Sequence, residues 1–210
     1  ANTDRVLTEI QKFWDRDHLF HEFGQTHKRG ILMWGPPGSG KSCTIKFIMK
    51  DVIEERAGIV IKFSHPRLFA DGMRIFREIE PNTPAVVLME DIDSIISDYS
   101  ETAVLNILDG VDKVERVVFL ASTNYPEVLG ARIVNRPSRF DKRFKIGHPN
   151  AESRRIFLKH ILCDHKKAET EGLKTQAALD KFIAAQAKRL KINLDQWVKD
   201  TKGFSMAHLK

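Results

Sequence analysis

The sequence predicts an α/β fold, in which a parallel five-stranded sheet carries helices on both faces and a small all-α domain follows. Three observations favour it. Short apolar runs alternate with helical patterns over the first 150 residues, which is typical of parallel strands covered on both faces. A glycine-rich turn separates the first of these runs from a helical segment. After Pro149-Asn150 only helical patterns remain.

The strands are expected where apolar runs are bounded by polar or turn-forming residues. These runs are 31–34, 59–63, 85–89, 117–121 and, as the fifth candidate, 143–146. Helical periodicity predicts helices over 42–55, 72–80, 102–108, 152–162, 176–190 and 194–201, and an amphipathic entry helix over 6–20. We therefore expect an α/β domain over residues 1–149 and a helical domain over residues 150–210.

The composition is that of an ordinary globular protein, with 42% hydrophobic and 30% charged residues in a chain of 210. No apolar run is long enough to span a bilayer, and the N-terminus lacks the layout of a signal peptide. The two cysteines lie far apart, which argues against a disulfide or a zinc site and favours two small buried side chains. We expect an intracellular protein of the cytoplasm or an organelle matrix. Because it begins at Ala1 rather than Met, we expect a domain excised from a longer chain.

The net charge of +6 is placed unevenly. Residues 1–150 carry 21 basic and 21 acidic side chains, whereas residues 151–210 carry 13 and 7, so the whole difference of 6 lies in the helical domain. A basic domain can meet nucleic acid or an acidic partner. A solvated helical surface is the simpler interpretation, since no nucleic-acid motif accompanies the charge.

A phosphate-binding loop is indicated by the pattern G-x-x-x-x-G-K-[ST], preceded by a strand and followed by a helix. Backbone N–H groups of such a loop point at phosphate oxygens, and the helix N-terminus adds a favourable dipole. Lys41 is expected to reach the β- and γ-phosphates of ATP, and Ser42 to ligate Mg²⁺. The loop comprises Gly35, Pro36, Pro37, Gly38, Ser39, Gly40, Lys41 and Ser42.

An acidic cluster follows the buried run 85–89. Acids at the carboxyl end of a parallel strand lie where ligands bind in such sheets. We expect Glu90 to hold Mg²⁺ through its water shell and Asp91 to orient or deprotonate the attacking water. A solvated loop start is the alternative, and the upstream loop makes it the weaker one.

Three further polar residues complete the candidate site. Asn124 ends the fourth strand and is expected to bind the γ-phosphate or position water, unless Asn-Tyr-Pro is a plain turn. Arg136 and Arg139 are three positions apart, and their guanidinium groups suit a phosphate. The alternative for these two is a surface ion pair, for instance with Asp141.

Together these motifs resemble the AAA family of ring-forming ATPases, from about Phe13 to the C-terminus. The resemblance covers the Walker A loop, the Walker B strand, Asn124 as sensor 1, the arginine-finger pair and the lid segment 201–205. Within the family the chain is most similar to the mitochondrial complex-III assembly subfamily, in the stretches 28–32, 88–93 and 105–111. That subfamily also has Glu-Asp where most members have Asp-Glu.

The resemblance implies a P-loop NTPase domain, a helical lid and a homo-oligomeric ring, usually of six subunits. ATP then lies between neighbours, with Arg136 and Arg139 reaching across, while Cys43 and Ala207 complete the nucleotide contacts. Such rings remodel, unfold or translocate macromolecules, most often proteins. A nucleic-acid motor or loader and a nucleotide-gated scaffold with slow turnover remain the alternatives.

The chain departs from the family pattern at several places, one of which is an extra helix expected in the lid over about 176–190. Asp91 is shorter than the usual catalytic Glu, and Met206 stands where Gly is common before Ala207. The pore loop is expected in 64–72, but its aromatic–hydrophobic–Gly motif is absent. Leu68-Phe69 is the nearest substitute, and a packed core aromatic is the equal alternative for Phe69.

Overall fold

The computed structural model describes residues 2–110, 115–134, 139–162, 176–205 and 208–209. The chain divides into two compact units, residues 1–36 with 41–146 and residues 37–40 with 147–210. The domain boundary expected between residues 149 and 150 remains a prediction. Cys163 lies outside the described residues.

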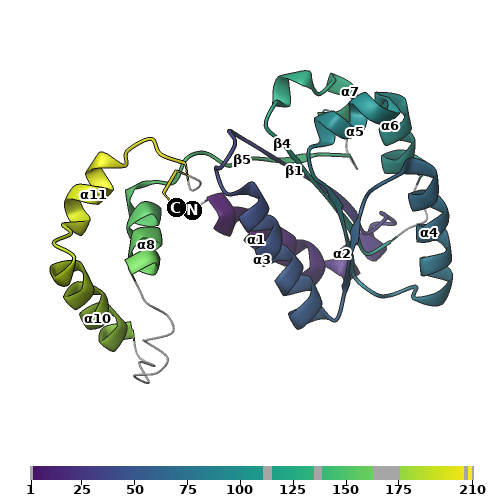
Figure 1. The fold of residues 1–210 in the computed structure, drawn as a ribbon. Coiled ribbons are helices and arrows are strands. Elements are labelled where there is room, and N and C mark those ends of the chain that lie inside the picture. Colours follow the sequence, from purple (N-terminus) through teal and green to yellow (C-terminus); the bar gives the residue numbers. More distant parts are fainter. Residues whose placement is uncertain (1, 111–114, 135–138, 163–175, 206–207, 210) are drawn as a thin grey trace. The chain divides into compact units, whose positions relative to one another are not determined.

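The first unit is built on a parallel five-stranded sheet (Figure 1), which confirms the predicted fold class. The strands are β1 (Lys28–Trp34), β2 (Ile59–Lys62), β3 (Ala85–Met89), β4 (Val117–Thr123) and β5 (Lys142–Lys145). Their spatial order is β2-β3-β4-β1-β5, and every pair is parallel. The carboxyl ends of β1, β3 and β4 therefore meet at one edge, where ligands bind in sheets of this kind.

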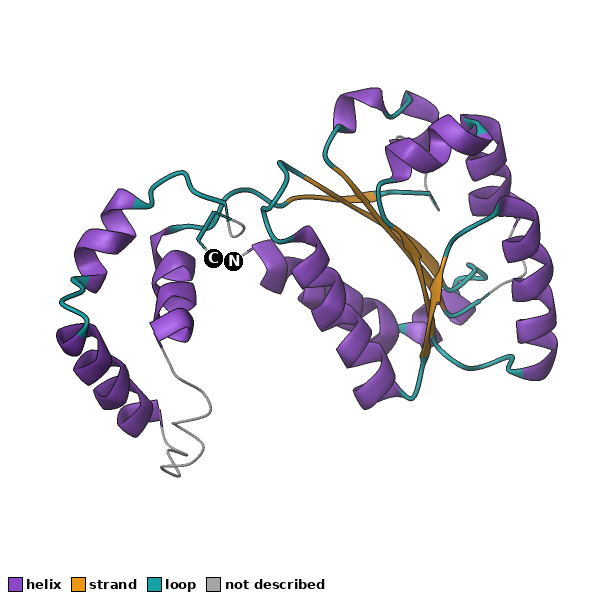
Figure 2. Ribbon diagram, viewed as in Figure 1, coloured by secondary structure: helices purple, strands orange, loops and turns teal. Residues whose placement is uncertain are grey.

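Helices cover both faces of this sheet (Figure 2). One face packs against α1 (Asn2–Asp15) and α3 (Lys41–Lys50), and the other against α4 (Pro66–Ile79), α5 (Ile92–Tyr99), α6 (Glu101–Gly110) and α7 (Ala131–Val134). Strand β3 contributes to the cores on both faces of the sheet. Val86 and Leu88 pack on the side of α1 and α3, and Val87 and Met89 pack on the side of α4 to α7. Burial on both faces explains why β3 is apolar throughout.

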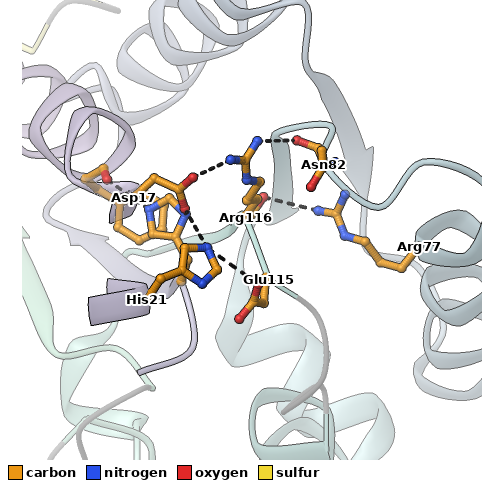
Figure 3. Close-up of polar contacts among 8 residues, drawn as sticks. Asp17, His21, Arg77, Asn82, Glu115 and Arg116 are labelled. Carbon is orange, nitrogen blue, oxygen red and sulfur yellow. Dashed lines mark hydrogen bonds and ion pairs between the residues drawn. The ribbon is translucent and has the colours of Figure 1, made fainter. Parts of the chain in front are cut away.

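A polar network joins the elements near the amino ends of β3 and β4 (Figure 3). Arg116, just before β4, donates hydrogen bonds to the Asp17 carboxylate on α2 (Asp17–Glu22) and to the Asn82 carbonyl at 3.0 Å. Arg77 on α4 donates to the Arg116 carbonyl at 3.2 Å. These contacts fix α2 and α4 against the end of the sheet opposite to the acidic cluster.

His27 is buried beside this network, directly before β1. Its ring stacks on Phe13 with centroids 4.0 Å apart, and Nε2 donates to the Phe13 carbonyl at 2.9 Å. Nδ1 lies 2.8 Å from Asp17 Oδ1. Burial lowers the pKa of His27, although the Phe13 carbonyl and the Asp17 charge act in the opposite direction. His27 thus ties α1 and α2 to the sheet.

The second unit contains the helices α8 (Ala151–Leu162), α10 (Gln176–Arg189) and α11 (Leu194–Asp200). Leu162 and Ile183 form its small apolar cluster. The buried Arg154 side chain donates to the carbonyls of Pro149 at 2.9 Å and Val198 at 2.8 Å, and so links α11 to the start of α8. The helical character expected of this segment is present in its described residues.

Two predictions about the N-terminal part differ from the structure. The entry helix expected over 6–20 is two helices, because Arg16 leaves the helical backbone at φ −106° and ψ 20°. This break separates α1 from α2, and Asp17, the first residue of α2, pairs with Arg116. Cys43, expected to be buried, is an exposed free cysteine on α3.

The segment 64–72, expected as a pore loop, is mostly helical. Pro66 begins α4, and the His65 side chain caps it by accepting from the Arg67 amide at 3.2 Å. Phe69 is 7% exposed and packs in the core, whereas Leu68 is 70% exposed. The alternative interpretation of Phe69 as a core aromatic is therefore the correct one.

Helix α5 was not expected from the sequence. It begins two residues after Glu90, since Asp91 adopts a left-handed backbone at φ +49° and turns the chain sharply out of β3. No described helix is long and apolar enough to cross a membrane.

Candidate functional site

The glycine-rich loop leads from β1 into α3, as the motif predicts. Gly35 has φ +155°, and a Cβ at this position would lie 2.0 Å from the Ile146 carbonyl oxygen. Only glycine allows the backbone to pass here. The hydroxyl of Ser39 is buried and has no hydrogen-bond partner among the described residues. An unpaired donor in this loop fits the binding of phosphate oxygens.

Lys41 is buried at the start of α3 and is held by three oxygens. Its Nζ donates to the carbonyls of Gly35 at 2.8 Å and Pro36 at 3.1 Å, and to Asn124 Oδ1 at 2.5 Å. Burial lowers the pKa of Lys41, while the charges of Asp91 and Asp93 oppose this shift. The structure thus brings together Lys41 and Asn124, which lie 83 positions apart in the sequence.

Ser42 and Glu90 are the two residues predicted to hold Mg²⁺. Ser42 Oγ lies 3.5 Å from Glu90 Oε1, so a hydroxyl and a carboxylate from α3 and the end of β3 face one another. Oxygen ligands of this kind are those that Mg²⁺ prefers. The pair therefore fits the ion.

Asp91 precedes α5 in a left-handed backbone conformation, and its side chain makes no cap hydrogen bond to the helix. It is exposed, and its charge acts on Lys41. A carboxylate that is not engaged in a cap keeps that acceptor capacity for other groups. This arrangement fits a base or an orienting group for water.

Two residues at this edge were missed by sequence reasoning. Thr123 Oγ1 donates to Asp93 and accepts from the Tyr125 amide at 2.9 Å, so it ties the start of α5 to the end of β4. The negative charge of Asp93 also acts on Lys41, where it opposes the lowering of the pKa by burial. The signals were present, since Asp93 is the third acid of the cluster and Thr123 immediately precedes Asn124.

Arg139 lies away from the residues grouped around Lys41. It is buried and pairs with Asp109 of α6, not with Asp141, and this contact raises the pKa of the guanidinium. Arg136, Met206 and Ala207 lie outside the described residues. The roles expected for Arg136, Arg139, Cys43 and Ala207 remain predictions.

The chain is similar to proteins of one ATPase family. Residues 31–148 match the family model described as "ATPase family associated with various cellular activities (AAA)". The chain is 30% identical to the ATP-dependent zinc metalloprotease FtsH 1 of Petrotoga mobilis. The similarity covers 76% of this chain and 27% of that protein. It is 29% identical to the cell division cycle protein 48 homologue of Archaeoglobus fulgidus, over 82% of this chain and 25% of the relative.

A third relative is the 26S proteasome regulatory subunit S10B homologue B of Arabidopsis thaliana, with 29% identity over 67% of this chain and 39% of that protein. The chain spans about a quarter of the length of the first relatives that it matches. The family match includes the glycine-rich loop, the acidic strand end and Asn124.

Proposed function

The chain is an ATPase domain of the AAA family, and from this premise we propose that it hydrolyses ATP as one subunit of a homo-oligomeric ring that remodels proteins. The observation that carries the proposal is the meeting of Lys41, Asn124, Ser42 and Glu90 where β1, β3 and β4 end. These residues come from three separate motifs. Their convergence at the ligand-binding edge of a parallel sheet supports a single catalytic site.

The chemistry follows from these contacts. Lys41 exchanges its carbonyl partners for the β- and γ-phosphate oxygens of ATP, with Asn124 beside it. Ser42, together with Glu90 through water, would hold Mg²⁺, which neutralises phosphate charge when bound. Asp91 accepts a hydrogen bond from the attacking water and takes up its proton as the oxygen bonds to the γ-phosphorus. The bond from the γ-phosphorus to the bridging oxygen breaks at the same time, so ADP leaves with that oxygen and phosphate is released.

A surface groove beside the catalytic edge supports assembly into a ring. A cavity of about 620 Å³ begins at Ser42 and Glu90 and continues between α3 and the edge strand β2. Its other lining residues are mostly apolar: Ile45, Lys46, Met49, Ile53, Gly58, Ile59, Val60, Lys62 and Leu88. Phe47 and Ile53 on the same helical segment are about half exposed. We propose that a second copy covers this groove and brings Arg136 toward the ATP.

A protein substrate is supported by the relatives, which include a metalloprotease and a proteasome regulatory subunit. The finer proposal places the chain beside the mitochondrial complex-III assembly subfamily, on the three stretches named above. The excess positive charge of residues 151–210 is the one observation that favours nucleic acid instead.

The test is steady-state phosphate release from Mg-ATP, measured alone, with an unfolded polypeptide and with single-stranded DNA. We expect release that the polypeptide stimulates. Stimulation by DNA that falls steeply with salt would replace the proposal with a nucleic-acid motor. ATP binding without measurable release would replace it with a nucleotide-gated scaffold.

A further inference from the structure

Arg139 is engaged within its own chain. Its side chain is 3% exposed, whereas that of its partner Asp109 is 49% exposed. Nε donates to Asp109 Oδ1 at 2.8 Å, and a terminal nitrogen donates to Asp109 Oδ2, so the pair is bidentate. The other terminal nitrogen donates to the Arg132 carbonyl. Bidentate arginine–carboxylate pairs are among the strongest and most directional polar contacts in proteins.

The backbone of Arg139 is fixed as firmly as its side chain. Its carbonyl oxygen would lie 1.9 Å from a Cβ on Gly30 of β1, so the two strands of chain approach as closely as glycine permits. The next residue, Phe140, is fully buried in the core under α6 and α7. The backbone of Arg139, from which its side chain extends, therefore cannot shift without disturbing the sheet.

The contacts of Arg139 join two helices. Asp109 belongs to the last turn of α6, and Arg132 belongs to α7. Glu101, at the start of α6, adds a further negative charge that raises the pKa of Arg139. The guanidinium thus contacts one carbonyl and one carboxylate of its own chain, and the charge of a second carboxylate acts on it. A group that serves a neighbour's phosphate must instead be exposed.

We propose that Arg139 is a positioning residue that clamps α6 to α7 in its own subunit, and that it is not one of the charges supplied across the ring. The clamp fixes the chain at Arg132 and at Arg139, on either side of residues 135–138. Arg136 lies among those four residues and, under the proposed function on which this inference rests, is then the one arginine of the pair that acts in trans. The two arginines of the motif have separate roles.

The first test is a double-mutant cycle of Arg139→Gln and Asp109→Asn, read as urea unfolding of the full chain without nucleotide. We expect each single change to lower the free energy of unfolding. The double variant should be at least as stable as the less stable of the two single variants. This corresponds to a coupling of about tenfold in the unfolding equilibrium constant. The exposed pair Arg74 and Glu78, 2.9 Å apart, gives the matched control cycle with little coupling. Additive effects at Arg139 and Asp109 would overturn the proposal.

The second test exchanges the two charges, in the variant that combines Asp109→Arg with Arg139→Asp. If Arg139 acts only by holding α6 to α7, the exchange recovers both unfolding stability and ATP turnover above the level of either single variant. Recovery of stability without turnover would show that Arg139 acts directly on the nucleotide, and would overturn the proposal. The unfolding cycle does not depend on ATP hydrolysis, so a failure of the proposed function would be visible separately, as a wild-type chain without turnover.

Discussion

At the scale of single residues, the buried charge of Lys41 is compensated by oxygen atoms of the candidate site. Its ammonium group is held by two carbonyls of its own loop and by Asn124, and the carboxylates of Asp91 and Asp93 act on it from the next motif. A buried ammonium group is costly unless such partners compensate it. The same partners orient Nζ toward the loop, so under the proposed function little rearrangement would be needed for phosphate oxygens to replace them.

Replacing Lys41 by Met should lower ATP affinity by at least about tenfold, because removal of a charge-assisted phosphate contact costs about 1.5–3 kcal/mol. The measurement is titration calorimetry with a slowly hydrolysed ATP analogue. Lys50→Met is the control, since Lys50 is an exposed residue of the same helix that pairs with Glu54. Equal affinity in the Lys41 variant and the wild type would show that the loop assignment is wrong.

Replacing Asp91 by Asn should lower ATP turnover by about 10²–10⁴-fold, the usual contribution of a general base. The amide cannot accept the proton of the attacking water, but it preserves the shape of the turn. ATP affinity should stay near that of the wild type, which separates this variant from Lys41→Met. Asp98→Asn, at an exposed position of α5, is the control, and an unchanged rate in Asp91→Asn would exclude Asp91 as the base.

Most of the residues around Lys41 were predictable, because each belongs to a short motif with a mechanical reason for its spacing. Glu90 and Asn124 follow buried strands, and strand order then brings them to one edge. The surroundings of Arg139 were not predictable. Its partner lies 30 positions away on α6, and no local pattern indicates which of two arginines three positions apart is buried.

At the scale of elements, Thr123 connects the end of β4 to the start of α5. Thr123→Val keeps the shape of the side chain but removes the donor to Asp93 and the acceptor of the Tyr125 amide. The free energy of unfolding should fall by about 1 kcal/mol, the low end of the penalty for unsatisfied polar groups, because Thr123 is buried whereas its two contacts are only partly buried. Urea unfolding measures this, with the exposed Thr102→Val on α6 as control. Equal losses in the two variants would contradict the role assigned to Thr123.

The attachment of α1 and α2 should depend on pH through His27. Burial lowers the pKa of His27 below its ordinary value near 6.5, so the unfolded chain binds a proton that the folded chain does not. The free energy of unfolding is therefore highest above pH 6.5 and falls as the pH decreases below it. Asp17, which opposes this shift, and His21 and Arg116, which reinforce it, are the charged groups that face His27.

The measurement is urea unfolding at pH 7.5 and pH 5.5 for the wild type and for His27→Gln, whose amide does not titrate. The variant should lose less stability than the wild type between the two pH values. His148→Gln, an exposed residue of the second unit, should behave as the wild type does. A larger loss in His27→Gln would mean that folding raises the pKa of His27, against this account.

The elements themselves were predicted well where burial is two-sided. The apolar runs of β3 and β4 indicate strands directly, since both faces pack on helices. The predictions were wrong where a single residue redirects the chain. Arg16 divides the entry helix, Pro66 starts α4 within the expected loop, and the left-handed Asp91 creates α5. The break at Arg16 goes with a tertiary contact, the pair of Asp17 with Arg116, that a local pattern does not contain. The start of α4 rests instead on local features, Pro66 and the His65 cap, which did carry a signal.

At the scale of the whole molecule, the catalytic edge opens beside an uncovered apolar groove. The groove begins at Ser42 and Glu90, so a neighbour that covers it would also stand next to the bound nucleotide. Under the proposed function, this placement would link assembly to catalysis, because the neighbour would both bury apolar surface and supply charge. An arginine supplied in trans contributes about 10³–10⁵ in rate in related phosphoryl transfers. Activity should therefore depend on contact between subunits.

The most direct measurement is the rate of phosphate release per subunit at saturating Mg-ATP, over a wide range of concentrations of the full chain. If a neighbour completes the site, the rate per subunit rises steeply with concentration and then reaches a plateau, and sedimentation velocity shows an oligomer over the same range. A rate per subunit that is the same at every concentration, with the chain sedimenting as a monomer, would contradict the account.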